Sequence, residues 1–235
     1  MTSGVRAVLF DLDDTLYPEH QFVDGGFQAV ARFLAGRSGR SEEALAARLW
    51  ELHVRDGRGR LFDTLIAELG LGDDRDLVAA CLLVYRTHAT RLAPFPGVEA
   101  LLESLRRANV RTGVVSDGNG AVQSRKLAGL GSVAERFDVV VLTDDLGPGH
   151  GKPSSTPFRV ACRLLDVEPS ATIYVGNDPR KDFAGARAAG LRTIRIGRLP
   201  DEGGASAIEV SAADDADLAV DSFSALATTL SGMTT

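Results

Sequence analysis

Hydrophobic and polar residues follow two different patterns along the chain. From about residue 17 to residue 91, apolar residues recur at helical spacing, as in Val23, Phe27 and Val30, and no convincing strand is found. After the turn residues 94–97, short apolar runs of strand type alternate with helical segments. The change of pattern predicts a helical block followed by an alternating α/β region.

The alternating region indicates a parallel sheet, because strands separated by helices form βαβ units. The first apolar run, Val8-Leu9-Phe10, precedes the helical block and must join the same sheet across it. We therefore expect a Rossmann-like, doubly wound α/β core formed by residues 1–16 and 94–235, with an inserted helical cap domain at 17–93. The further strands are predicted at Val110–Val115, Asp138–Leu142, Ala171–Val175, Leu191–Ile196 and Leu218–Val220.

Composition limits the classes of protein to consider. The chain has 235 residues, of which 44% are hydrophobic, which is enough for a buried core. A net charge of −6 argues against a general nucleic-acid binder. No apolar run is long enough for a membrane span and residues 1–10 do not resemble a secretory leader, so we expect a cytoplasmic protein, either a monomer or a homodimer, without a membrane partner. Cys81 and Cys162 are expected to be buried free thiols.

Two acids follow the first apolar run directly. The two-residue period of a strand places Asp11 and Asp13 on one side of the chain, with Leu12 opposite. They lie at the carboxyl end of the strand, where open α/β sheets bind their ligands. Two neighbouring carboxylates need a metal ion or a shared proton. An acidic turn that caps the next helix is the alternative interpretation.

The later strand ends are polar as well. Ser116 and Gly118 stand just before a predicted helix, where a hydroxyl and backbone amides suit an anion such as phosphate. An ordinary strand-to-helix connection has the same composition. Acids in the segment Gly176–Asp182 suit the oxygen-ligand shell of Mg²⁺, although Asp182 is equally suited to a helix N-cap.

Lysine is rare in this chain. Only Lys126, Lys152 and Lys181 are lysines among 26 basic residues. A lysine head group at position 152 can reach a phosphoryl oxygen or keep two carboxylates ionised. A solvated loop lysine is the alternative. We expect Gln123 and Lys126 to lie on the helix behind Ser116 and assign them no function.

Four motifs in this order resemble those of the haloacid dehalogenase superfamily. The run Asp11-Leu12-Asp13-Asp14-Thr15-Leu16 resembles the first motif, Ser116 the second, Lys152 the third and Gly176–Asp182 the fourth. The resemblance covers nearly the whole chain, and the helical insertion resembles the C1 cap of the family. Asp13 indicates the phosphatase branch, because true haloacid dehalogenases lack this second acid.

The resemblance implies a Mg²⁺-dependent phosphatase that acts on a small phosphorylated metabolite. Asp11 would be the nucleophile that forms an aspartyl-phosphate. Asp13 would be the acid and then the base, with its side chain outside the metal shell. Lys152 would act beside them. The implied phosphate-binding residues are Thr15, Ser116, Asp117 and Gly118, and Thr15 would also support the loop.

The fourth motif departs from the family pattern. Asn177 stands where the family usually has Asp after the glycine, and the acid has moved to Asp178. Either side chain offers an oxygen to Mg²⁺, and we expect Asp178 to be the ligand, with Asp182 acting through water. The implied metal ligands are Asp11, the main-chain oxygen of Asp13, Asp178, Asn177 and Asp182.

The cap is expected to select the substrate. Its segment Trp50–Phe62 carries His53, Arg55, Arg58 and Arg60, which could reach a second anionic group of the substrate when the cap closes. A solvated basic loop is the alternative.

Other functions are weaker candidates. A receiver-like signalling domain would match Asp13-Asp14, Asp117 and Lys152-Pro153, but receivers are shorter and have no helical insertion. A catalytically weakened family member with a regulatory or binding role remains an alternative because of Asn177. A nucleotide triphosphatase is excluded, since Gly151-Lys152 lacks the upstream glycine of a P-loop.

Overall fold

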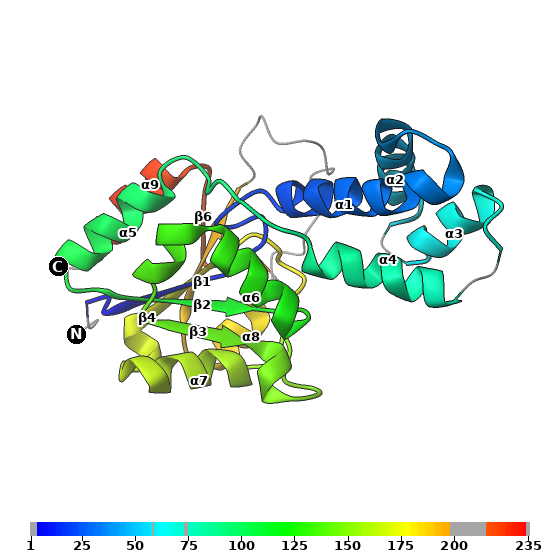
Figure 1. Ribbon diagram of the computed structural model, residues 1–235. Helices are drawn as coiled ribbons and strands as arrows, with labels where there is room; N and C mark the ends of the chain where they lie inside the picture. The colour runs from blue at the N-terminus through cyan, green and yellow to red at the C-terminus, as the bar shows by residue number, and fades with distance from the viewer. Residues whose placement is uncertain (1–3, 58, 73–74, 198–214, 234–235) are drawn as a thin grey trace. The chain divides into compact units, whose positions relative to one another are not determined.

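The computed structural model describes residues 4–57, 59–72, 75–197 and 215–233. The chain divides into two compact units. One consists of Met1–Pro18 with Leu92–Thr235 and contains the sheet, whereas the other, Glu19–Arg91, is helical. Figure 1 shows the strands in the first unit and the helices α1 to α4 in the second.

The first unit is built on a six-stranded sheet in the order β3-β2-β1-β4-β5-β6, in which every described pairing is parallel. In its register Phe10 of β1 lies opposite Val114 of β2 and Val175 of β4. The prediction of a doubly wound α/β core is therefore confirmed. The strands are β1 (Ala7–Phe10), β2 (Arg111–Ser116), β3 (Val139–Leu142), β4 (Thr172–Gly176), β5 (Arg192–Ile196) and β6 (Leu218–Val220).

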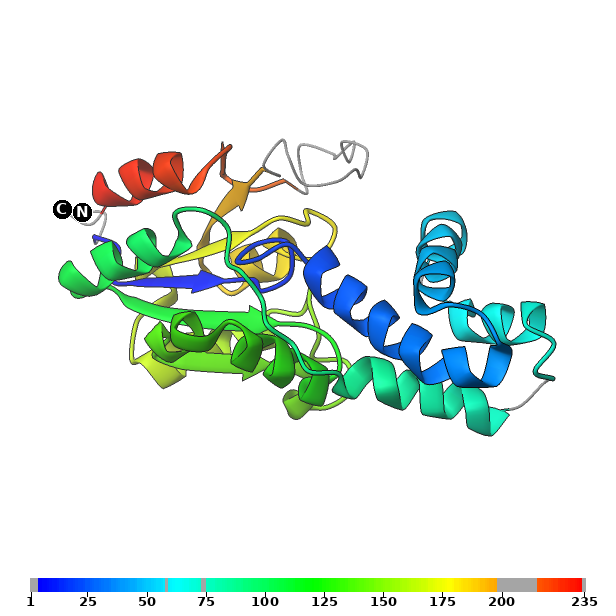
Figure 2. The same cartoon turned by 45° about the horizontal axis from the view of Figure 1, so that its top comes forward.

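Helices cover the two faces of this sheet, as Figure 2 shows. α5 (Val98–Arg107) and α9 (Phe223–Ser231) pack together on one side. On the other side lie α7 (Thr156–Leu165) and α8 (Phe183–Ala188), whose Phe158 and Phe183 share one buried cluster with Leu9 of β1. The central strands are buried on both faces, so they consist of apolar runs without alternating polar positions. The remaining elements of this unit are α6 (Gly120–Gly129) and the 3₁₀ turns η1 (Gly131–Arg136), η2 (Thr143–Leu146) and η3 (Pro169–Ala171).

The second unit consists of α1 (His20–Ser38), α2 (Glu42–Asp56), α3 (Leu61–Glu68) and α4 (Arg75–Thr87). The predicted stripe of α1, from Val23 to Leu34, is buried in its core. Ser41 begins α2 as an N-cap whose side chain accepts the Ala44 N–H, which satisfies one of the free amides of the first turn. A helical block therefore occupies the predicted insertion, and its role as a cap stays a proposal.

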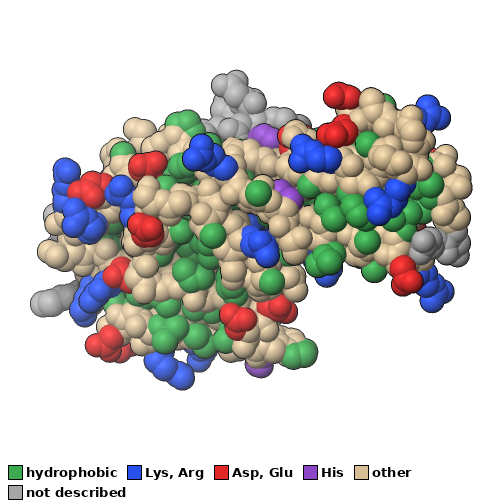
Figure 3. Space-filling model, viewed as in Figure 1, with side chains coloured by type: hydrophobic (Ala, Val, Ile, Leu, Met, Phe, Trp, Pro, Cys, Tyr) green, Lys and Arg blue, Asp and Glu red, His purple; other side chains and the backbone are tan. Residues whose placement is uncertain are grey.

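Charged side chains of both signs are spread over the face seen in Figure 3. Within the described residues, no helix combines the length and the apolar character that crossing a bilayer requires. Cys81 and Cys162 are buried free thiols, as predicted.

Candidate active site

Asp11 lies just beyond the carboxyl end of β1 and is almost fully buried. Its Oδ1 accepts a hydrogen bond from Lys152 Nζ at 2.5 Å, and its Oδ2 lies 3.5 Å from Thr15 Oγ1. The side chains of Asp11 and Lys152 are 3% and 0% exposed. The first and third motifs therefore meet at the carboxyl edge of the sheet.

Lys152 also holds a second acid. Its Nζ donates to Asp182 Oδ1 at 2.7 Å and lies 3.0 Å from the hydroxyl of Tyr174. Burial opposes a charge on Lys152, but the negative charge of Asp11, followed by the interactions with Tyr174 and Asp182, raises its pKa well above the usual value. These contacts favour the charged form of Lys152, and its burial shows that it is not the solvated loop lysine of the alternative interpretation.

Two carboxylates share this single ammonium group. Burial is the main reason that the pKa of Asp11 rises to about 7, and the charge of Asp182 adds to it while Lys152 opposes it. A further positive charge placed beside Asp11 would therefore stabilise its ionised form.

Asp182 stands at the N-cap position of α8 but makes no side-chain cap bond there. Its Oδ2 instead accepts the backbone N–H groups of Asn177 at 3.1 Å and Asp178 at 2.9 Å. Gly176 makes this possible, since a Cβ at that position would lie 2.5 Å from Asp182 Oδ2. One oxygen of Asp182 therefore holds the fourth-motif turn, while the other binds Lys152.

Asp178, the fourth-motif acid expected to bind the metal, is paired with another side chain. Asp178 binds the side chain of Arg180 at 2.8 and 2.9 Å, and although burial opposes it, this pairing holds its pKa below the usual value. Asn177 Oδ1 instead lies 3.3 Å from the Thr15 hydroxyl that also contacts Asp11. Within the described ranges, no group of three or more His, Cys, Asp or Glu residues could hold a metal ion.

The remaining donors still fit Mg²⁺. Asp11 Oδ2 and Asn177 Oδ1 both lie within 3.5 Å of Thr15 Oγ1, so a carboxylate and an amide oxygen face the same small space. Mg²⁺ binds in proteins through one or two carboxylates together with water and phosphate oxygens. The contacts favour Asn177 as the fourth-motif ligand, and the predicted assignment to Asp178 stays a prediction.

Ser116 ends β2 and is buried, and the turn that follows leads into α6. Gly118 in this turn has a φ of +117°, which a side chain would strain. Asn119 caps α6 by accepting the Val122 N–H. Both Asp117 carboxylate oxygens accept the Lys152 backbone N–H at 3.1 Å, so this side chain holds the third-motif loop and leaves only its backbone for a phosphate.

Asp13 lies past the end of β1, so the strand alternation expected for it does not apply. Its carboxylate binds a separate set of donors on α6 and in its own turn. Lys126 Nζ lies 2.8 Å from both oxygens, Gln123 Nε2 lies 2.9 Å from Oδ2, and the Tyr17 hydroxyl lies 2.5 Å from Oδ1. Burial would raise the pKa of Asp13, but Lys126 and these hydrogen bonds hold it below the usual value.

Comparison with known proteins places the chain in a family. The family model of the haloacid dehalogenase-like hydrolases matches residues 5–190. The chain belongs to the haloacid dehalogenase-like hydrolases. The resemblance read from the four motifs is therefore confirmed, and the chain is a hydrolase.

Several relatives of this hydrolase are phosphatases. A glyceraldehyde 3-phosphate phosphatase of Methanopyrus kandleri is 36% identical over 200 residues, covering 83% of this chain and 84% of the relative. A phosphoserine phosphatase of Thermus thermophilus is 32% identical over 175 residues, covering 74% of this chain and 66% of the relative. The crystal structure of a HAD phosphatase from Thermococcus onnurineus is 25% identical, with a TM-score of 0.63 over 98% of this chain and 100% of the other.

Sequence reasoning missed several residues of the candidate site. Gln123 and Lys126 were expected behind Ser116 without a function, whereas both are buried and contact Asp13, and Gln123 Nε2 also lies 2.7 Å from Ser116 Oγ. Their i, i+3 spacing, which puts both on one helix face, and the rarity of lysine were the available signals. Tyr174, in an apolar strand, gave no such signal.

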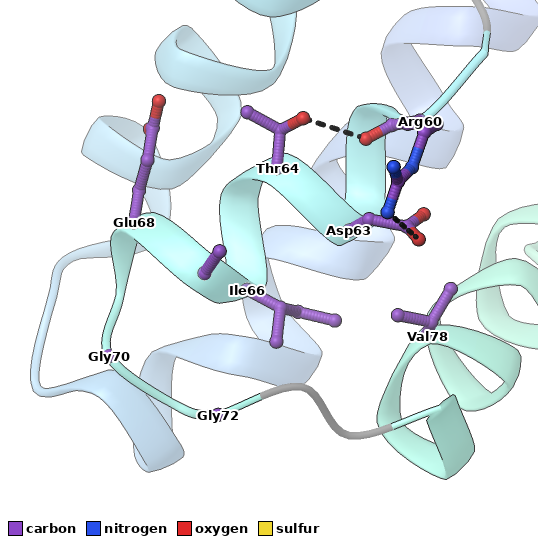
Figure 4. Close-up of a pocket in the computed structure, with 9 residues that line it drawn as sticks. Arg60, Asp63, Thr64, Ile66, Glu68, Gly70, Gly72 and Val78 are labelled. Atoms are coloured by element: carbon purple, nitrogen blue, oxygen red, sulfur yellow. Dashed lines mark hydrogen bonds and ion pairs between the residues drawn. The ribbon is translucent and has the colours of Figure 1, made fainter.

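The described arginines of the predicted basic segment lie next to neighbouring acids. Arg55 pairs with Asp56, Arg60 lies 3.5 Å from Asp63, and Arg58 lies outside the described residues. Figure 4 shows Arg60 and Asp63 beside a hollow of about 730 Å³ between α3 and the start of α4. These contacts do not test a substrate-selecting role, which stays a prediction.

Proposed function

We propose that this hydrolase is a Mg²⁺-dependent phosphatase that cleaves a small phosphorylated metabolite through an aspartyl-phosphate on Asp11. The observation that carries the proposal is the buried contact of Asp11 with Lys152, at the sheet edge where Ser116 and Asp13 also lie. Its family and its phosphatase relatives make the enzyme a hydrolase of phosphoric monoesters.

In the first step an Asp11 carboxylate oxygen attacks phosphorus in line with the leaving oxygen. The new bond joins Asp11 to phosphorus, the bond from phosphorus to the substrate oxygen breaks, and Asp13 in its acid form gives that oxygen its proton. Lys152 compensates the negative charge that accumulates around the transferred group. Ser116 and the amides that follow it hold the other phosphoryl oxygens.

In the second step water attacks the phosphorus of the aspartyl-phosphate. Asp13 takes a proton from the water, the bond between Asp11 and phosphorus breaks, and inorganic phosphate leaves. The lowered pKa of Asp13 suits this step, because an ionised carboxylate is the acceptor that it needs, and it means that the first step draws on the minor, protonated form of Asp13.

Mg²⁺ would be held by Asp11 and Asn177 together with the main-chain oxygen of Asp13. When bound, it would neutralise part of the charge on the carboxylate and the phosphate, which otherwise repel each other. The contacts of Asp178 and Asp182 suit support of this loop, since both carboxylates already bind cationic side chains.

The helical unit is the proposed cap, and residues 1–16 with 94–235 the proposed catalytic domain. The relatives that act on glyceraldehyde 3-phosphate and on phosphoserine support a substrate of a few carbon atoms. Small phosphorylated sugars and acids are therefore the first compounds to test.

The test is phosphate release from a panel of sugar phosphates, nucleotides and small phosphorylated acids, with and without Mg²⁺, beside Asp11→Asn. We expect Mg²⁺-dependent turnover of a small phosphate, and a loss of at least about 1,000-fold in Asp11→Asn because the nucleophile is gone. Turnover that survives this substitution would contradict the mechanism. Stable phosphorylation without turnover would support the receiver-like alternative.

A further inference from the structure

Lys126 is the strongest partner of Asp13, and it lies outside all four motifs. Its Nζ is 2.8 Å from Oδ1 and 2.8 Å from Oδ2, while its side chain is only 5% exposed. An ammonium that bridges both oxygens fixes the position and the plane of a carboxylate at once, and buried charge-assisted bonds are about twice as strong as neutral ones.

The two other partners of Asp13 are neutral and bind one oxygen each. Tyr17 donates to Oδ1 at 2.5 Å and Gln123 to Oδ2 at 2.9 Å. A carboxylate has about four acceptor positions, so these two donors and the two contacts of Lys126 occupy all of them. A water molecule that gives its proton to Asp13 must therefore replace one neutral donor, whereas Lys126 can keep its contact.

Gln123 also connects Asp13 with the second motif. Its single Nε2 lies 2.9 Å from Asp13 Oδ2 and 2.7 Å from Ser116 Oγ. Because Gln123 and Lys126 lie three residues apart on α6, this helix sets the position of Asp13 relative to Ser116.

We propose that Lys126 is a positioning residue for the hydrolysis of the aspartyl-phosphate: it holds the Asp13 carboxylate in place through both oxygens while water replaces Gln123 or Tyr17. The inference rests on the proposed function, in which Asp13 is the base of the second step. Lys126 would thus support the second step through Asp13, without contacting the substrate itself.

The test uses p-nitrophenyl phosphate and rapid mixing, with saturating Mg²⁺. Because p-nitrophenolate leaves without a proton, the first step does not need Asp13, but hydrolysis does. For Lys126→Met we expect a burst of about one p-nitrophenolate per active site and then a kcat lower by about 100-fold, while kcat/KM stays within about threefold of the wild type.

Arg125→Met is the matched control, because Arg125 is an exposed cation on the same helix, one residue away. It should behave like the wild type. An unchanged kcat in Lys126→Met would overturn the proposal, and so would kcat and kcat/KM falling together without a burst, since a merely structural role gives that result. If Lys126→Met does not fold by its thermal unfolding curve, the uncharged Lys126→Gln is judged by the same criteria. If that variant does not fold either, Lys126 has a structural role and the proposal is overturned.

Asp13→Asn separates this inference from the proposed function. It should give the same burst with almost no later turnover. If Asp13→Asn keeps the wild-type kcat, the proposed role of Asp13 fails. If Asp13→Asn gives the burst and Lys126→Met does not, only the role of Lys126 fails.

Discussion

Lys152 and Asp11, which are 141 positions apart in the sequence, form a buried ion pair 2.5 Å long. The same ammonium group lies 2.7 Å from Asp182, so one cation joins the first, third and fourth motifs. Stability and the proposed catalysis therefore depend on the same few atoms.

Removing this cation should destabilise the protein. Lys152→Met leaves Asp11 and Asp182 buried without their common partner, and breaking a buried ion pair in this way costs about 3–5 kcal/mol. The free energy of unfolding from urea denaturation measures the loss. Lys181→Met is the control, with a smaller loss expected, since Lys181 is half-buried and its charge acts on Asp11 without the hydrogen bonds that Lys152 makes. The double variant Lys152→Met/Asp182→Asn should recover part of the loss, and no recovery would contradict the shared-cation interpretation.

The stability of the metal-free protein should depend on Asp11 and pH. The folded-state pKa of Asp11, about 7, is above the unfolded value of 3.8. The contribution of protonated Asp11 to the free energy of unfolding is therefore full below the unfolded pKa and is lost as pH rises through 7. At about pH 8 in EDTA, Asp11→Asn should therefore be more stable than the wild type by a few kcal/mol, at about 1.4 kcal/mol per pKa unit, and this difference should be less than half as large at about pH 5, where ionisation of Asp11 in the unfolded chain has begun to matter but the folded protein still keeps the proton. Urea denaturation at both pH values measures this, and equal differences would contradict it.

The metal ligand of the fourth motif can be identified by titration. Asn177 Oδ1 shares Thr15 with Asp11, whereas Asp178 pairs with Arg180. We expect Asn177→Ala to raise the Mg²⁺ concentration for half-maximal activity by about tenfold, the loss of one oxygen ligand. Asp178→Ala should raise it less. The reverse order would support the assignment to Asp178.

Gly176 should not tolerate a side chain. In Gly176→Ala the new Cβ would meet Asp182 Oδ2 at 2.5 Å, and such overpacking costs about 1–3 kcal/mol. Activity should fall with it, because Asp182 orders Lys152. Gly36→Ala is the control, since Gly36 lies in α1 with open space around it and should be neutral or slightly stabilised. Thermal unfolding and phosphate release compare the two variants.

The sheet and the edge that carries the candidate site could be predicted, because buried parallel strands produce apolar runs that polar residues end abruptly. Asp11, Ser116 and Lys152 follow such runs or the loops after them. The observed strands begin within one residue of the predicted ones, and the small shifts arise because strand ends are set by pairing with neighbours and not by hydrophobicity alone.

The partners of each acid could not be predicted in the same way. Asp11 and Asp13 are two residues apart, yet one binds Lys152 and the other binds Lys126. Their directions depend on the turn after Phe10, in which the Leu16 N–H donates to the Leu12 carbonyl and Asp14 has a positive φ of 52°. Periodicity carries no information about such a turn, so it could not assign a lysine to each acid.

The insertion of the helical unit after β1 has a consequence for folding. β1 pairs with β2 and β4, which begin at Arg111 and Thr172, so its backbone stays unpaired until those strands have been synthesised. Such long-range pairing slows folding, and an apolar strand left open in the meantime is prone to aggregate. Glu19–Arg91 contains its own buried cluster and can fold earlier, which brings the end of β1 and the start of the later chain closer together.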